Sequence, residues 1–142
     1  MPPPRLRDRI ESLLRDELSR LGRPGLSFLL CLSDASWRAA MREVACPSYA
    51  ARLASPTARR GTRGKLGMAT VCHFRHAHSA VVYVKTRGRT WSEIEDTVRH
   101  EALHLARPSY SHRQVEAALG HHVPPRWPRR RRRQGRHAGV NP

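Results

Sequence analysis

Two histidines and one glutamate lie close enough in the sequence to form a metal-dependent hydrolytic site. They are His100, Glu101 and His104, and the segment HEALH that contains them matches the pattern HExxH. On a helix, the two histidines lie one turn apart on one face and suit zinc as ligands, while the glutamate suits the role of general base. The match indicates function only if the segment is helical, so we next ask whether the flanking residues predict a helix.

The flanking residues favour a helix over residues 91–106. Thr90 and Glu93 match a capping box, which predicts that the helix begins at Trp91, and Pro108 prevents continuation past Ala106. Apolar residues recur at helical spacing and predict a buried stripe beside the two histidines: Trp91, Ile94, Val98, Ala102 and Leu105. The β-branched run at residues 80–84 predicts a strand just before this helix.

A catalytic zinc normally has three protein ligands, so a third must come from the chain after the motif. Ser111 and Gln114 match a second capping box, which places His112 in the first turn of a short helix and Glu116 one turn later on the same face. We favour His112 as the ligand, because imidazole suits zinc and lies nearer the bend; Glu116 is the alternative. Tyr110 is a candidate oxyanion donor. Glu101 would take a proton from the attacking water and pass it to the leaving nitrogen.

The remaining patterns predict an α+β fold with one domain over residues 1–122. It contains an N-terminal helix, a small three-stranded and mostly antiparallel sheet, the motif helix and a short C-terminal helix. The predicted elements before the motif helix are a helix at 6–21, strands at 26–32, 66–74 and 80–85, and a helix at 33–44. Residues 123–142 are rich in Pro, Arg and Gly and are expected to be a disordered basic tail.

The chain is strongly basic. It carries 27 Lys and Arg against 11 Asp and Glu, a formal net charge of +16, and the tail includes Arg129–Arg133. Such a balance favours contact with a polyanion such as nucleic acid, with an affinity that falls steeply with salt. The alternative is that the arginine-rich tail serves only for solubility.

The cysteines and the N-terminus favour a cytoplasmic protein. Cys31, Cys46 and Cys72 cannot all pair with one another and form no CxxC spacing, which favours a reducing compartment. The first residues lack the apolar core of a signal peptide, and no segment has the length of apolar sequence that spans a bilayer, so no membrane contact is expected.

The segment RHEALHLARPSYSH, preceded by a strand and a capped helix start, resembles the active-site segment of zincin metallopeptidases. It is most similar to the small SprT-like and minigluzincin kind, and the similarity covers residues 80–120. The resemblance implies that His100 and His104 bind Zn²⁺, that Glu101 is the general base and that His112 completes the site. It also implies a protein or peptide substrate, which zincins commonly lay along an edge strand. Some SprT-like proteases act on protein crosslinked to DNA, which would suit the basic surface.

The sequence departs from the patterns of two other metalloprotein groups, and these differences rank the possible functions. The glycine-containing HExxHxxGxxH pattern of metzincins is absent, which argues against that subclass. The segment also resembles bacterial rRNA-maturation metalloproteins, but these carry HGxLHL, so that Glu101 stands in place of a glycine. A zinc metallopeptidase is therefore the first hypothesis. A metal-dependent endoribonuclease or rRNA-maturation-like factor is the second, and a non-catalytic basic nucleic-acid-binding protein is the third.

Overall fold

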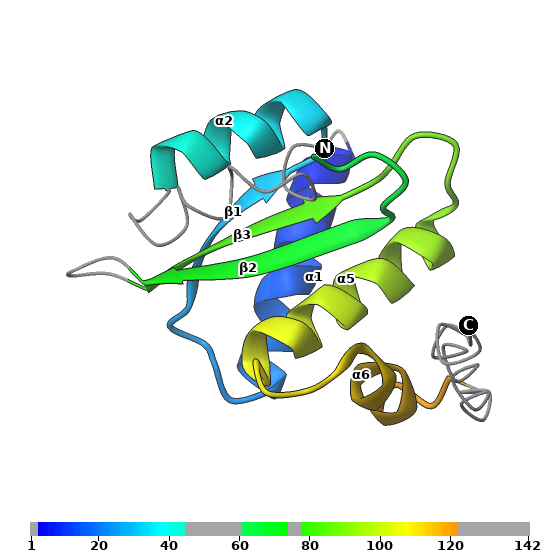
Figure 1. The fold of residues 1–142 in the computed structure, drawn as a ribbon. Coiled ribbons are helices and arrows are strands. Elements are labelled where there is room, and N and C mark those ends of the chain that lie inside the picture. The colour runs from blue at the N-terminus through cyan, green and yellow to red at the C-terminus, as the bar shows by residue number, and fades with distance from the viewer. Residues whose placement is uncertain (1–2, 45–60, 74–77, 122–142) are drawn as a thin grey trace, which may run out of the picture.

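Four helices and a three-stranded mixed sheet form an α+β fold (Figure 1). The structure is a computed structural model that describes residues 3–44, 61–73 and 78–121. The elements are α1 (Leu6–Arg20), β1 (Ser27–Cys31), α2 (Asp34–Val44), β2 (Gly67–His73), β3 (His78–Val84), α5 (Trp91–Ala106) and α6 (His112–Ala118). All seven were expected from the sequence, with boundaries that differ by at most a few residues. The expected disorder of residues 123–142 lies outside the described residues.

The sheet has the order β1-β3-β2, with β3 in the centre. β1 pairs with β3 in parallel, with Leu29 opposite Val81, and β2 pairs with β3 antiparallel, with Ala69 opposite Val82. The prediction of a mostly antiparallel sheet is therefore wrong. Only the short connection between β2 and β3 forces a reversal of direction, whereas the path from β1 through α2 and β2 leaves β1 and β3 pointing the same way.

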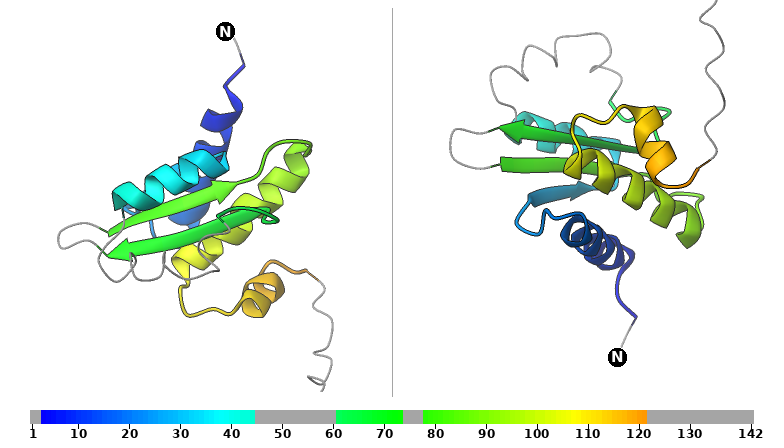
Figure 2. Two further views of the ribbon diagram at one scale, coloured as in Figure 1. Left: turned by 45° about the horizontal axis from the view of Figure 1, so that its top comes forward. Right: turned by 90° about the horizontal axis from the view of Figure 1, so that it is seen from below.

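Helices cover both faces of the sheet, as Figures 1 and 2 show: α2 lies on one face, and α1 and α5 lie on the other. The central strand serves both layers, because successive side chains point to opposite faces. Val82 and Val84 belong to the cluster formed with α1 and α5, while Val81 and Tyr83 belong to the cluster formed with α2. This double burial accounts for the unbroken apolar run of β3 in the sequence.

Helix α5 has the boundaries that the sequence predicted. The Thr90 side chain accepts a hydrogen bond from the backbone N–H of Glu93 at 3.3 Å. The carboxylate of Glu93 instead lies 3.8 Å from Nε of Arg89. Of the two hydrogen bonds of the predicted capping box, this helix start therefore has the one to the Thr90 side chain and lacks the one from the Thr90 N–H to Glu93. At the other end, the N–H of Arg107 donates to the carbonyl of Leu103 at 2.8 Å.

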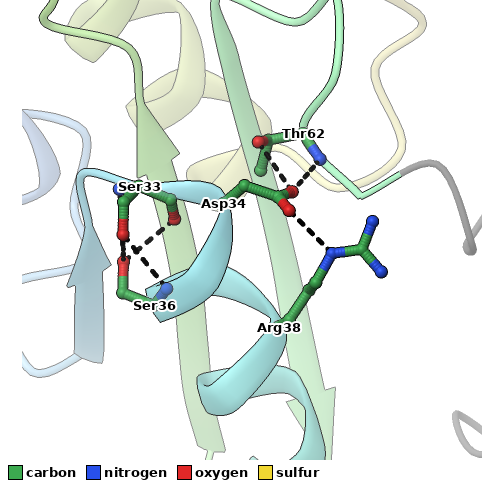
Figure 3. Close-up of polar contacts among 5 residues, drawn as sticks. All are labelled: Ser33, Asp34, Ser36, Arg38 and Thr62. Carbon is green, nitrogen blue, oxygen red and sulfur yellow. Dashed lines mark hydrogen bonds and ion pairs between the residues drawn. The ribbon is translucent and has the colours of Figure 1, made fainter.

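A polar cluster attaches the segment before β2 to the start of α2 (Figure 3). One carboxylate oxygen of Asp34 accepts from the N–H and the hydroxyl of Thr62, at 2.8 and 2.9 Å, and the other accepts from Nε of Arg38 at 2.7 Å. The hydrogen bond from the Thr62 backbone, followed by that from Arg38, lowers the pKa of the Asp34 carboxyl. A Cβ at Gly61, where φ is +57°, would lie 2.3 Å from Asp34 Oδ1, so only glycine allows this approach.

We predict that Asp34→Ala lowers the free energy of unfolding by about 1–3 kcal/mol at pH 7, because the two Thr62 donors lose a charged acceptor. Urea unfolding measures the change. The folded-state pKa of Asp34 is depressed, so its contribution is present above the ordinary aspartate pKa, and the difference from wild type should shrink as the pH falls below about 4.

The exposed Asp16→Ala is the matched control for the lost negative charge. It should change stability by less than about 0.5 kcal/mol. Equal losses in the two variants would mean that net charge, and not the Thr62 contacts, causes the effect.

Candidate metal centre

Three histidines from two helices meet where α6 packs against α5. His100 and His104 lie one turn apart on α5, and His112 is the first residue of α6, which returns beside α5 (Figures 1 and 2). One ring nitrogen from each lies within 4.8 Å of the others. The Nε2 atoms of His100 and His104 are 3.0 Å apart, close to the separation of about 3.3 Å that tetrahedral zinc imposes on its nitrogen ligands.

The alternative ligand, Glu116, contacts the far side of the cluster. The Nδ1–H of His100 donates a hydrogen bond to Oε1 of Glu116 at 2.7 Å. Nε2 of His100 is therefore unprotonated, and its lone pair faces His104. The carboxylate also lies 3.8 Å from Nε2 of His112 and forms a close contact with Nδ1 of His121. Burial opposes ionisation of Glu116, but the hydrogen bond from His121 and the neighbouring imidazoles outweigh it and lower the pKa.

The two α5 histidines have the protonation state that a metal requires. Burial lowers the pKa of both imidazoles, and each is lowered further by neighbouring histidines: His104 and His112 act on His100, and His112 acts on His104. Only 12% of the His100 side chain is exposed. Both rings are therefore held as neutral imidazoles at neutral pH, the form that binds a metal ion.

Glu101 is the only buried acidic side chain beside the histidines in the described chain, with 5% of its surface exposed. Burial raises its pKa from 4.5 to about 7. A divalent cation at the histidines would favour the ionised form, because an opposite charge nearby lowers a carboxyl pKa. The carboxyl group is therefore set to exchange a proton near neutral pH.

A cleft of about 940 Å³ lies between β2 and α5 and reaches Glu101, His104 and His112. Its other lining residues are Arg23, Lys65, Gly67, Met68, Ala69, Thr70, Leu105 and Pro108. A smaller hollow of about 440 Å³ shares Lys65, Gly67 and Glu101 and extends to His100 and Glu116. Among the described strands β2 is at an edge of the sheet, and Met68, Ala69 and Thr70 of this strand line the cleft.

The close packing of β2 on α5 depends on Gly67. A Cβ built on this residue would lie 2.6 Å from Cγ2 of Thr97 and 2.9 Å from Oε1 of Glu101. Sequence reasoning assigned no role to Gly67. The available signal was a glycine within a strand pattern, which often marks close approach of another group.

The structure does not place every predicted site residue at the cluster. Tyr110 is 36% exposed and lines neither hollow, so its role as oxyanion donor stays a prediction.

Arg129–Arg133 lie outside the described residues. The described part carries 16 Lys and Arg against all 11 acidic residues, so much of the excess charge lies elsewhere in the chain. No helix among the described residues is long and apolar enough to cross a membrane.

Comparisons with protein-family models, with curated proteins and with solved structures found no match.

We predict that Gly67→Ala lowers the free energy of unfolding by about 1–3 kcal/mol, because the added methyl group overlaps Thr97 and Glu101. Urea unfolding measures the loss. Gly25→Ala is the control, since a Cβ there meets no atom within 4 Å and its φ is ordinary. It should leave stability unchanged or slightly raise it. An unaffected Gly67→Ala protein would contradict the tight contact between β2 and α5.

We also predict that Glu101→Gln stabilises the metal-free protein at pH 8. The folded-state pKa is raised, so wild-type folding becomes less favourable as the pH rises from about 4.5 to 7, whereas glutamine stays uncharged. The gain should be on the order of 3 kcal/mol at pH 8 and nearly absent at pH 4.5. Urea unfolding in chelator at several pH values measures it. A difference that does not vary with pH would contradict the burial of an ionisable Glu101.

Proposed function

We propose that this protein is a zinc-dependent peptidase in which Glu101 is the general base. One observation carries the proposal: three imidazoles converge within 4.8 Å beside a buried glutamate, in a cleft bordered by an edge strand. The cluster supplies the metal ligands, the glutamate supplies proton transfer, and the strand supplies a surface for an extended peptide.

The three side chains fit zinc. His100, His104 and His112 would hold the ion through neutral nitrogen atoms, and a set of three histidines is one of the ligand sets of catalytic zinc, with the fourth position open. Zinc bound there would lower the pKa of a water molecule to about 7 and polarise a carbonyl group. Glu116 would position His100, because a carboxylate that accepts the second N–H of a ligand imidazole fixes its tautomer and orientation.

Glu101 would carry the proton transfers of peptide hydrolysis. In its ionised form it takes a proton from the attacking water, and in its acid form it returns that proton to the leaving nitrogen. A carboxyl group whose pKa is raised by burial suits both steps, since it accepts and releases a proton readily near neutral pH. Gly67 and Glu101 both line the cleft, and the missing side chain of Gly67 leaves the room that the carboxyl group occupies beside β2.

The edge strand favours a peptide over RNA as substrate. Met68, Ala69 and Thr70 of β2 line the cleft, and the free edge of a strand offers regularly spaced N–H and C=O groups to an extended chain. RNA would be recognised through its phosphates and bases, and it has no peptide backbone that could pair with the edge of a strand. The metal-dependent endoribonuclease and the non-catalytic nucleic-acid-binding protein remain the alternatives that the following experiment separates.

We predict that the zinc-loaded protein cleaves unfolded protein substrates and that a chelator abolishes the cleavage. Glu101→Gln should retain zinc and lower kcat by at least about a hundredfold, the contribution of a positioned general base. Mass spectrometry of the products and metal analysis of the protein measure the two effects. Zinc-loaded protein that cleaves RNA but no protein substrate would overturn the proposal in favour of the endoribonuclease, and zinc-loaded protein that cleaves neither would overturn it in favour of the non-catalytic binding protein.

Matched variants separate the ligands from the positioning residue. His104→Ala and His112→Ala should lose zinc after dialysis, because two imidazoles do not hold a catalytic zinc ion. Glu116→Gln should keep the site but bind zinc about 10–100-fold more weakly, as expected for a residue that acts through His100. Loss of zinc in Glu116→Gln, with retention in His112→Ala, would make Glu116 the third ligand.

A further inference from the structure

Two cationic side chains lie towards opposite ends of the cleft. Lys65 comes just before β2 and also lines the smaller hollow, which extends along α5 to Arg89 and Glu93. Arg23 lies in the turn after α1, and the guanidinium of Arg107 ties this turn to the end of α5 through a 3.2 Å hydrogen bond to the carbonyl of Leu21. Glu101 and His104 therefore lie between the two cations along the helix.

Hydrogen-bonded turns fix the backbone of both cationic residues. The N–H of Arg23 donates to the carbonyl of Leu18 at 2.8 Å, and the carbonyl of Arg23 accepts from Leu26 at 3.3 Å. The N–H of Lys65 donates to the carbonyl of Thr62 at 2.9 Å, and Thr62 is bonded through its side chain and its N–H to Asp34. Each backbone is thus attached to a neighbouring helix, which fixes where the charged side chain begins.

Among the described side chains, no carboxylate forms an ion pair with either cation. The described acidic side chains that form ion pairs do so with partners other than Arg23 and Lys65. Glu101 is the only acidic residue among those that line the larger cleft. A metal ion at the histidines would add further positive charge, so the cleft is electrostatically complementary to an anionic ligand.

We infer that Arg23 and Lys65 select peptides that carry acidic side chains on both sides of the scissile bond. This inference rests on the proposed peptidase function and adds a substrate class to it. An extended peptide laid along β2 would cross the metal centre with one flank near Lys65 and the other near Arg23. Acidic side chains on those flanks would meet an unpaired cation at each end, which favours them over neutral and basic ones.

The experiment compares peptides of one sequence that carry Glu, Gln or Lys on both sides of the cleavage site. The zinc-loaded full-length protein should cleave the Glu peptide with the highest kcat/KM. Arg23→Glu and Lys65→Glu should each lower kcat/KM for this peptide about fivefold or more, as expected when an exposed charge pair is replaced by repulsion. The double variant should prefer the Lys peptide, a gain that misfolding cannot produce.

The control is Arg87→Glu, which reverses an exposed charge in the turn before α5 that lines neither hollow. It separates the cleft cations from the general charge of the chain. Equal cleavage of the Glu and Gln peptides would overturn the inference. So would an equal loss in Arg87→Glu, because the preference would then come from the net charge.

Binding distinguishes failure of the inference from failure of the proposed function. Fluorescence anisotropy with labelled peptides and zinc-loaded Glu101→Gln should give the same order of affinities and the same effects of Arg23→Glu and Lys65→Glu. If the wild type cleaves no peptide, the proposed function fails and these affinities alone decide the inference. A single-stranded oligonucleotide that displaces the Glu peptide at lower concentration, with the same dependence on Arg23 and Lys65, would assign the cations to nucleic acid and overturn it.

Discussion

The packing of α5 against the sheet and α1 is the constraint on which the rest of the structure depends. Ile94, Val98 and Ala102 form one buried stripe of this helix and belong to the main hydrophobic cluster. Because Glu101 and the two histidines lie beside that stripe on the same rigid helix, core packing also decides where their side chains point. The site is thus an extension of the core, and a shift of α5 would move a proton-transfer group and two candidate ligands together.

Burial favours the uncharged forms of Glu101, His100 and His104. Burial raises the pKa of Glu101 and lowers the pKa of His100 and His104, since each charged form is poorly solvated. Only Glu116, which contacts His100 and His121, is shifted towards its charged form. Binding of a divalent cation and ionisation of Glu101 would therefore favour each other, because each supplies the opposite charge that the other lacks.

Features coded by neighbouring residues could be predicted from the sequence, and features that depend on distant residues could not. A cap, an apolar stripe and a proline define α5, so its boundaries were predictable, and a second local cap placed His112 near the motif. The parallel pairing of β1 depends on the path of the whole chain. The contact of Asp34 with Thr62 spans 28 residues, and the approach of Gly67 to Glu101 joins a strand to a helix. Such contacts leave no periodic signal in the sequence.

The candidate site divides its ligands between a rigid element and a lightly held one. Helix α6 has a single buried residue, Val115, and the His112 side chain is 75% exposed, compared with 12% for His100. Apart from Val115, its side chains reach α5 through the ring of His112, whose centroid lies 4.5 Å from that of His100, and through Glu116, which accepts a hydrogen bond from His100. A metal ion held by all three histidines would fasten α6 to α5 by coordinate bonds. Metal affinity and the position of α6 would therefore be linked, so that substitutions in α6 remote from the ion would also change its binding.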